Sequence, residues 1–329
     1  MNNRRKVIAA LGVGAFTFPL GPFAQTLPKV WRIGVLNPSA RPAPETRSVY
    51  TNFFEALRDL GYVDGRNIAV QWLFAENNLQ RLPELAAQLV KSKVDLIVTN
   101  STPAVRAAQQ ATATTPIVAL SFGDPVGSGF AKSLARPGGN ITGTTIISTE
   151  LNAKRLEILV EIVPHVIRIA YLMNPDNSSQ AQAQILEKAA RKANKEIVVV
   201  NARAANELSA AFAQMIRERA GALMVANDTV LNDHRQRIGE LALQHRLPSM
   251  FASGLLSTEL RLVNYAQDGH QTSRSAAMMA VKIFKGAKPA DIPIEQPTHF
   301  NLVVNLKTAK ALGITIPQTI MVRADRVIQ

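Results

Sequence analysis

The sequence predicts an α/β protein of two similar, doubly wound parallel-sheet lobes with a ligand cleft between them. Three observations lead to this prediction. Strand patterns alternate with helical patterns along the chain, as in parallel sheets with right-handed crossovers. The alternation restarts near residue 146, which divides the 329 residues into two halves. In each half, two of the strand patterns end in Asn followed by further polar residues.

The start of the chain predicts an export signal at 1–24. Arg4, Arg5 and Lys6 precede an uncharged run at 7–24 that is rich in Ala, Gly and Phe. A basic start, an apolar stretch and a small final residue describe a signal of the Sec or the twin-arginine type. An N-terminal membrane anchor is the alternative, because the run approaches the length of a membrane span. With cleavage, the mature protein is expected in the periplasm.

The first half of the mature chain carries strand patterns separated by two helical patterns and an Ala-rich one. Apolar residues at helical spacing mark the first helix, and strict alternation marks the second strand. The expected strands are 32–36, 68–74, 95–99, 116–120 and 141–147, and the expected helices are 46–60, 82–90 and 104–113. A Pro-Gly-Gly turn precedes the last of these strands.

The second half repeats the rhythm and ends in a less regular tail. Its expected strands are 167–173, 196–200, 222–226, 248–251, 262–265 and 300–304, with helices at 152–163, 271–285 and 308–312. We expect an N-terminal lobe of 25–145 plus about 264–299. The C-terminal lobe is expected to comprise 146–263 plus about 300–329.

The chain is strongly basic, with a formal net charge of +13. Without the three basic residues of the signal, 34 basic and 24 acidic residues remain, a charge of +10. The basic residues are scattered, and no Lys/Arg stripe interleaves with aromatic residues. We therefore interpret the charge as a solvated surface and predict no nucleic-acid partner. The charge is compatible with steering of acidic partners.

Motifs for catalysis and metal binding are missing from the sequence. Cysteine is absent, so the chain has no disulfide and no thiol nucleophile. The five histidines show no metal spacing, and His234 and His245 fall on a predicted, charged helix where they are expected to be solvated. There is neither a Gly-x-Ser-x-Gly elbow nor a phosphate-binding loop. We predict that the protein is not an enzyme and uses no cofactor or metal.

Polar turns at the strand ends form the predicted binding site, because ligands bind at the carboxyl ends of parallel strands. The candidates are Asn37, Ser39, Asn100, Ser101, Thr102, Ser121, Phe122, Asp124, Asn174, Asn227, Asp228 and Tyr265. The asparagine amides offer both donors and acceptors. Turn formation is the alternative role for some of them.

A zwitterionic ligand would divide its contacts among these residues. Ser101 and Thr102 precede a helix start at Pro103 and suit a carboxylate, although capping of that helix is the alternative. Asp228 and Asp124 are the candidates for an ammonium group. Asp124 precedes Pro125, so it is also a candidate helix cap. Phe122, Tyr265 or Tyr50 would meet the rest of the ligand, and Phe122 is equally suited to the core.

Several longer motifs resemble a known family. They are Gly-Asp-Pro-Val-Gly at 123–127, Ser-Leu-Ala-Arg-Pro-Gly-Gly-Asn-Ile-Thr-Gly at 133–143, Lys-Gly-Ala-Lys-Pro-Ala-Asp-Ile-Pro at 285–293 and Asn-Leu-Lys-Thr-Ala-Lys-Ala-Leu-Gly at 305–313. These segments closely resemble the TrpX-like ABC transporter substrate-binding proteins, and the resemblance covers essentially the whole mature chain. One segment departs from the family pattern. Where many members have Gly-Leu-Met-Ser-Tyr-Gly, this chain has Arg-Leu-Val-Asn-Tyr-Ala at 261–266.

The resemblance implies a type I periplasmic-binding-protein fold, in which three crossing segments join two lobes that close on a ligand. It also implies a monomeric solute receptor that delivers its cargo to an ABC permease and its ATPase and meets the membrane only through that permease. The expected solute is an amino acid or a related small carboxylate. A ligand-sensing protein that partners a signalling protein is the alternative, and an enzyme on the same fold is the third possibility.

Overall fold

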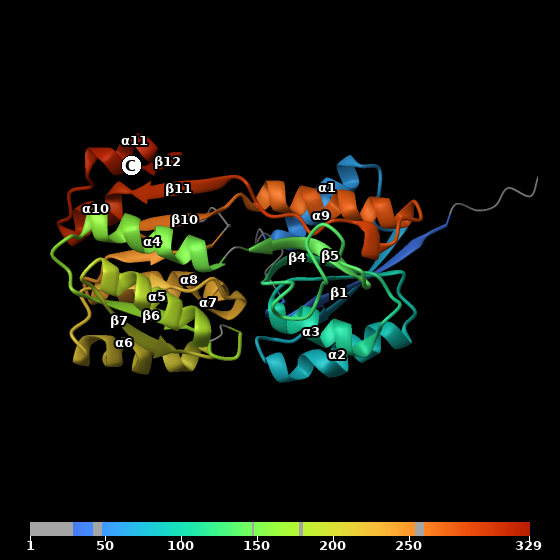
Figure 1. Cartoon of the computed structure of the whole chain (residues 1–329), viewed down its shortest axis with the longest axis horizontal. Helices are drawn as coiled ribbons and strands as arrows, with labels where there is room; N and C mark the ends of the chain where they lie inside the picture. The colour runs from blue at the N-terminus through green and yellow to red at the C-terminus, as the bar shows by residue number, and fades with distance from the viewer. Residues whose placement is uncertain (1–28, 42–47, 147, 178–179, 254–259) are drawn as a thin grey trace, which may run out of the picture.

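Two separate β-sheets organise the chain, one in each of two α/β lobes (Figure 1). The computed structural model describes residues 29–41, 48–146, 148–177, 180–253 and 260–329. The predicted export signal at 1–24 lies outside the described residues. None of the helices in these ranges has the length and apolar character that a membrane crossing requires. The two-lobe α/β prediction is confirmed.

The first lobe is built on a five-stranded parallel sheet with the strand order β2-β1-β3-β4-β5. The strands are β1 (Trp31–Asn37), β2 (Ile68–Phe74), β3 (Leu96–Thr99), β4 (Ile117–Gly123) and β5 (Ile141–Ile146). The helices are α1 (Val49–Asp59), α2 (Leu82–Lys91), α3 (Thr102–Ala111) and α9 (Gly269–Phe284). Two short 3₁₀ helices, η1 (Leu79–Arg81) and η3 (Pro289–Asp291), also belong to this lobe.

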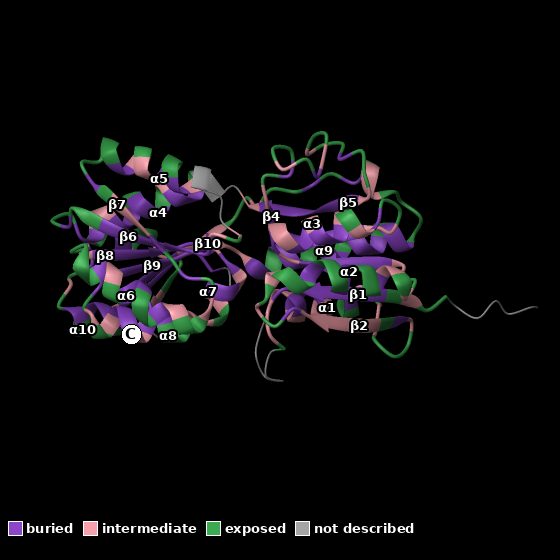
Figure 2. Cartoon of the chain, turned by 90° about the horizontal axis from the view of Figure 1, so that it is seen from below, coloured by how far each residue is buried: buried purple, intermediate pink, exposed green. Residues whose placement is uncertain are grey.

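The core of the first lobe lies on both faces of its sheet. Ile33 and Val35 pack with α1 and α9 on one face. Leu36 packs with α2 and α3 on the other, because successive strand side chains point to opposite faces. Figure 2 shows β1 and β4 largely buried and the edge strand β2 of intermediate burial, with exposed residues on the outer sides of the helices. The sheet is therefore held rigidly, and so are the turns at its carboxyl end.

The second lobe contains a seven-stranded sheet with the order β12-β11-β10-β9-β8-β6-β7. All its pairings are parallel except β10 with β11. The strands are β6 (Arg168–Met173), β7 (Glu196–Asn201), β8 (Ala222–Val225), β9 (Ser249–Phe251), β10 (Val263–Gln267), β11 (Phe300–Asn305) and β12 (Arg326–Ile328). The helices are α4 (Ser148–Ile162), α5 (Gln180–Lys192), η2 (Ala205–Glu207), α6 (Leu208–Arg217), α7 (Thr229–Asp233), α8 (Arg235–Gln244), α10 (Leu306–Leu312) and α11 (Gln318–Arg323).

The chain passes between the lobes after β5, after β10 and before β11 (Figure 1). We expected the segment from about 264 to join the first lobe, and this boundary is wrong for one strand. β10 pairs with β9 and β11 and so belongs to the second sheet. The change of lobe comes at Asp268, whose carboxylate accepts the His270 N–H at 2.8 Å and caps α9.

The helix expected to carry His234 and His245 is also interrupted. His234 lies between α7 and α8, and His245 caps the end of α8. The His245 ring is half-buried and stacks on Phe212, with ring centroids 5.8 Å apart. His245 is thus partly solvated, with one ring face against an aromatic neighbour.

Candidate ligand-binding cleft

A cavity of about 170 Å³ opens between the lobes at the carboxyl ends of β1, β3 and β4, and we call it the inter-lobe cavity. A cavity of about 150 Å³ is enough to hold benzene, so this space suits a small solute. Of the predicted site residues, the structure places the following at its wall: Asn37, Ser39, Asn100, Ser101, Thr102, Ser121, Phe122 and Asn227. The prediction that strand-end turns of both lobes face one cavity therefore agrees with the structure at these positions.

Ser101 is the most unusual residue of the wall. Its backbone has φ = 81°, a conformation that side-chain-bearing residues adopt only when their surroundings enforce it. Its N–H donates to the Ser121 carbonyl at 2.8 Å, which ties the turn after β3 to β4. Its hydroxyl oxygen is buried, has no hydrogen-bond partner and does not cap α3. The capping alternative therefore fails for Ser101, whose hydroxyl oxygen is buried at the cavity wall without a partner among the described residues.

Thr102 and Ser121 make contacts within the protein from the same corner. The Thr102 hydroxyl accepts the Gly123 N–H at 3.1 Å. The Ser121 hydroxyl accepts a hydrogen bond of 3.3 Å from Gln267 Nε2, at the end of β10. The other amide atom, Gln267 Oε1, is buried without a partner. Ser101 and Gln267 thus each have a side-chain oxygen that the described part of the protein leaves unsatisfied.

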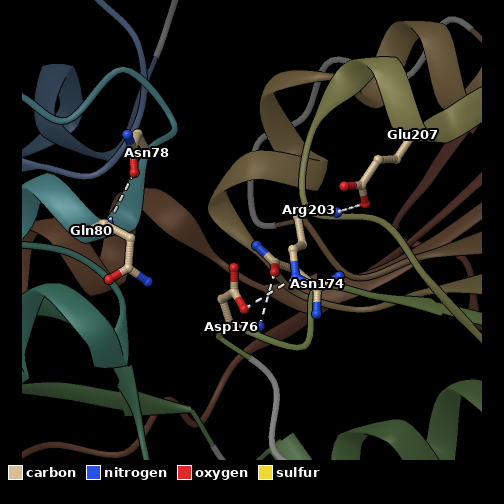
Figure 3. Close-up of polar contacts among 6 residues, drawn as sticks. All are labelled: Asn78, Gln80, Asn174, Asp176, Arg203 and Glu207. Carbon is tan, nitrogen blue, oxygen red and sulfur yellow. Dashed lines mark hydrogen bonds and ion pairs between the residues drawn. The ribbon is translucent and has the colours of Figure 1, made fainter.

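Asn37 and Asn174 form matching turns in the two lobes. Asn37 Oδ1 accepts the Ser39 N–H, and Asn174 Oδ1 accepts the Asp176 N–H, each at 3.0 Å. Figure 3 shows the second turn, where the Asp176 carboxylate also meets the guanidinium of Arg203 at 3.3 Å. The same view shows the Asn78 side chain capping η1 in the first lobe. Asn174 does not line the cavity, so its structural role corrects the expected ligand contact.

The two aspartates expected to face an ammonium group are engaged elsewhere. Asp228 is buried, accepts the Leu231 N–H at 2.9 Å and caps α7. Burial raises the pKa of this carboxyl, and hydrogen bonds from Leu231 and Asn177 partly oppose the rise. Asp124 is exposed and accepts the Gly127 N–H at 2.9 Å. Neither lines the cavity, and each accepts a backbone N–H of its own turn.

The aromatic candidates also separate. The Tyr265 ring packs on Phe300 at 5.9 Å within the second lobe and lies outside the cavity wall, which corrects the expected contact. Phe122 is buried against Phe130 and reaches the wall only in part. Tyr50 lines the cavity, and its hydroxyl donates to the Leu36 carbonyl at 3.2 Å. Burial raises the pKa of this phenol, so Tyr50 stays neutral.

Arg155 is the principal wall residue that the sequence prediction missed. It lies on α4, is 2% exposed, and donates through Nε to the Tyr265 carbonyl at 2.7 Å. Its Nη1 donates to Asn152 Oδ1 at 2.8 Å. Burial lowers the pKa of this guanidinium to about 10, so it remains charged at neutral pH. A signal was present, since Arg155 stands four residues from Leu151 and from Leu159 on the buried stripe of the helix.

Asp233 places a carboxylate at the rim of the cavity from the second lobe. Loss of water around the carboxyl raises the pKa of Asp233, and the polar side chains of Ser39 and Asn77 in the first lobe partly oppose the rise. Arg235, two residues later in the chain, also lines the cavity. Asp233 thus contacts both lobes. Within the described ranges, no group of three or more His, Cys, Asp or Glu side chains is placed to hold a metal ion.

Known proteins resemble the chain along its length. The sequence profile of the family described as "ABC transporter substrate binding protein" matches residues 32–328. A protein of Clostridioides difficile strain R20291, the "Tyrosine-binding protein", is 28% identical over 273 residues, which are 82% of this chain and 78% of that protein.

Two solved structures of similar identity differ in how well they superimpose. The "ABC domain in complex with L-Trp" from Streptococcus pneumonia is 25% identical, has a TM-score of 0.81 and covers 91% of this chain and 99% of its own. A "ligand-free, open structure" of a substrate-binding protein from Clostridium difficile is 27% identical and covers 91% of this chain and 100% of its own. Its TM-score is 0.63. The chain thus superimposes better on the ligand-bound structure.

Proposed function

Because the chain belongs to the family of ABC transporter substrate-binding proteins, we propose that it is the periplasmic solute receptor of an ABC uptake transporter. The family consists of binding proteins and not of enzymes. The proposed solute is an amino acid or a related small carboxylate. The proposed partners are a permease and its ATPase, to which the loaded receptor delivers its cargo.

One observation carries this proposal: a polar cavity lies between two lobes, and two of its wall residues have buried side-chain oxygens without a partner. These oxygens, Ser101 Oγ and Gln267 Oε1, accept no hydrogen bond from any residue that the structure describes. A buried polar group without a partner costs about 1–3 kcal/mol, so a site that is left this way is prepared for a ligand. The relatives named for tyrosine and L-Trp support an amino acid as that ligand.

Closure of the lobes on the solute is part of the proposal. Asp233 and Ser39 line the cavity from different lobes, and the influence of Ser39 on the pKa of Asp233 requires that the lobes are close. The higher TM-score to the L-Trp complex than to the open, ligand-free structure supports the same interpretation. A solute that contacts both lobes would stabilise this arrangement, because only differential contacts can shift a conformational equilibrium.

Tryptophan fluorescence of the mature protein tests the proposal directly. The Trp72 ring lies edge-on to Tyr50 at 5.7 Å, and Tyr50 lines the cavity. Trp31 is the other tryptophan and stacks on Phe284. The Trp31→Phe variant therefore leaves one reporter beside the site. Amino acids and small carboxylates that lack an indole are titrated by fluorescence, and L-tryptophan by melting temperature.

A bound solute should quench or shift the Trp72 emission and also raise the melting temperature. At 100 times its dissociation constant it should add about 2.7 kcal/mol of stability. Transport is then measured with the receptor added to vesicles that hold the permease and ATPase encoded beside it. A protein that responds to no amino acid, carboxylate or other small solute would refute the receptor function.

A further inference from the structure

The cavity wall holds a buried positive charge without a negative partner among the described residues. Arg155 is 2% exposed, and its two hydrogen bonds go to neutral oxygens, the Tyr265 carbonyl and the Asn152 amide. Arg155 takes part in none of the ion pairs formed between described residues. Burying an uncompensated charge is costly, so such a charge in a binding site calls for a ligand of opposite sign.

The guanidinium has donors to spare for that ligand. An arginine carries five N–H donors, of which Nε–H and one on Nη1 are used here. The two residues that accept these hydrogen bonds, Asn152 on α4 and Tyr265 on β10, belong to the same lobe as Arg155. Asn152 is fixed in turn by its hydrogen bond to the Tyr171 hydroxyl at 3.3 Å. The charged group is thus held in place before a solute arrives, which lowers the entropy cost of binding.

The wall offers less to an ammonium group. Asp233 is the acidic side chain among the described wall residues, and it is exposed to solvent. Deeper in the cavity, the unsatisfied Gln267 Oε1 is a neutral acceptor. Gln267 lies two residues beyond Tyr265 on β10, and the Tyr265 carbonyl accepts the hydrogen bond from Arg155. The guanidinium and the Gln267 amide are therefore both positioned by this strand.

We propose that Arg155 binds a carboxylate of the solute and that this carboxylate, and not an ammonium group, is what the protein requires. Carboxylic acids with or without an amine are then the accepted class, and amines or amides of the same shape are rejected. This inference rests on the proposed receptor function and narrows its solute class. It adds Arg155 to the carboxylate corner predicted at Ser101 and Thr102, on the opposite lobe.

Matched probes and calorimetry with the mature protein test the requirement. The probes are L-tyrosine, 3-(4-hydroxyphenyl)propionate without the amine, and tyramine and L-tyrosinamide without the carboxylate. L-Tryptophan and L-leucine with their corresponding acids, amines and amides extend the set to other sizes. We expect both acids of the best-fitting set to bind and its amine and amide to bind about 10-fold to 100-fold more weakly, as expected for a lost charge-assisted hydrogen bond.

Variants at Arg155 assign the preference to this side chain. R155M and R155Q should abolish the preference of acid over amide, whereas R155K, which keeps the charge, should retain part of it. R155Q keeps hydrogen-bonding capacity and serves if R155M fails to fold. K154M is the matched control, because Lys154 is exposed and pairs with Glu157. It should bind as the unmodified protein does.

Three results would overturn the inference, and they separate it from the receptor function. A purely structural role would make R155Q weaken acid and amide equally. Preferred binding of an amine, amide or uncharged solute would refute the carboxylate requirement and leave the receptor function intact. Binding of no solute at all would remove both.

Discussion

Asn177 and Asp228 connect the loops that follow β6 and β8, with Asn177 Nδ2 donating to Asp228 Oδ2 over 2.7 Å. The second carboxylate oxygen, Oδ1, accepts the Leu231 N–H at 2.9 Å and caps α7. Asp228 is 1% exposed. This buried carboxylate therefore holds together two loops behind the cavity wall. Its substitution should mainly lower the free energy of unfolding.

The Asp228→Ala variant should lose about 1 kcal/mol of unfolding free energy, the usual cost of removing a helix cap. Asp228→Asn retains a capping oxygen and serves as the control. Urea unfolding monitored by circular dichroism measures both. If the alanine variant is as stable as the unmodified protein but no longer binds solute, Asp228 is a ligand residue after all.

Asp228 should also leave a signature in the pH dependence of stability. Burial raises its folded-state pKa above 3.8, so the folded protein holds the proton more tightly than the unfolded chain does. This contribution is fully present below pH 3.8 and is lost as the pH rises through the folded-state pKa. The stability of the unmodified protein relative to Asp228→Asn should therefore fall between pH 3.5 and neutrality, by roughly 1.4 kcal/mol for each unit by which the pKa is raised. An unchanged difference across this range would contradict the assignment.

Ser101 is expected to lower the stability of the protein while it contributes to solute affinity. Its backbone conformation, at φ = 81°, suits glycine, and such strain costs about 1–3 kcal/mol. Ser101→Gly should therefore raise the unfolding free energy by about 1 kcal/mol, after the greater flexibility of the unfolded glycine chain is counted. Its solute affinity should fall about tenfold with the lost hydroxyl.

Ser101→Ala separates the two effects, because it removes the hydroxyl and keeps the strain. Its affinity should fall like that of the glycine variant without the gain in stability. Equal affinity in all three proteins, measured by calorimetry, would exclude Ser101 from the site.

Asp233→Ala should loosen the closed arrangement of the lobes. Removing this carboxylate removes its interaction with the first lobe, so the population of closed molecules should fall, and the apparent affinity with it. We expect a larger radius of gyration by X-ray scattering and a several-fold weaker affinity. Asp176→Ala is the control, because this exposed carboxylate pairs with Arg203 of its own lobe. Tighter binding by Asp233→Ala would contradict the closing role.

Export should depend on the residues at 1–24. Cell fractionation is expected to place the protein in the periplasm, shortened at its N-terminus. Replacing Arg4 and Arg5 by Lys should block export by a twin-arginine route and leave a Sec route working, since positive charge is kept. A full-length protein in the membrane fraction would instead indicate an anchor.

The sequence predicted the strand ends well because their signals are local. The pattern Asn-Pro followed by Ser39 or Asp176 specifies the same turn in both lobes, so Asn37 and Asn174 could be placed from sequence. Which of the two faces the cavity depends on how the lobes are docked. Local patterns do not encode that relationship, and the structure places Asn37 but not Asn174 at the cavity wall.

The remaining differences have similar causes. Asp228 follows a strand, as ligand residues often do, but its side chain caps the N-terminus of α7. Arg155 was overlooked because a basic residue on a helix is usually solvated, although its place on an apolar stripe pointed inward. The sequence pattern of its strand led us to expect Tyr265 near the ligand. In the structure its ring packs on Phe300 of β11, the antiparallel neighbour of its strand.

The position of α9 links the architecture to the order of synthesis. This helix packs against α1 and the first sheet, yet it ends at Phe284 in a chain of 329 residues. A ribosome must therefore translate the second lobe's strands β6 to β10 before one face of the first lobe is covered. Until then Ile33 and Val35 lack part of their packing, and the emerging chain cannot complete its first lobe early.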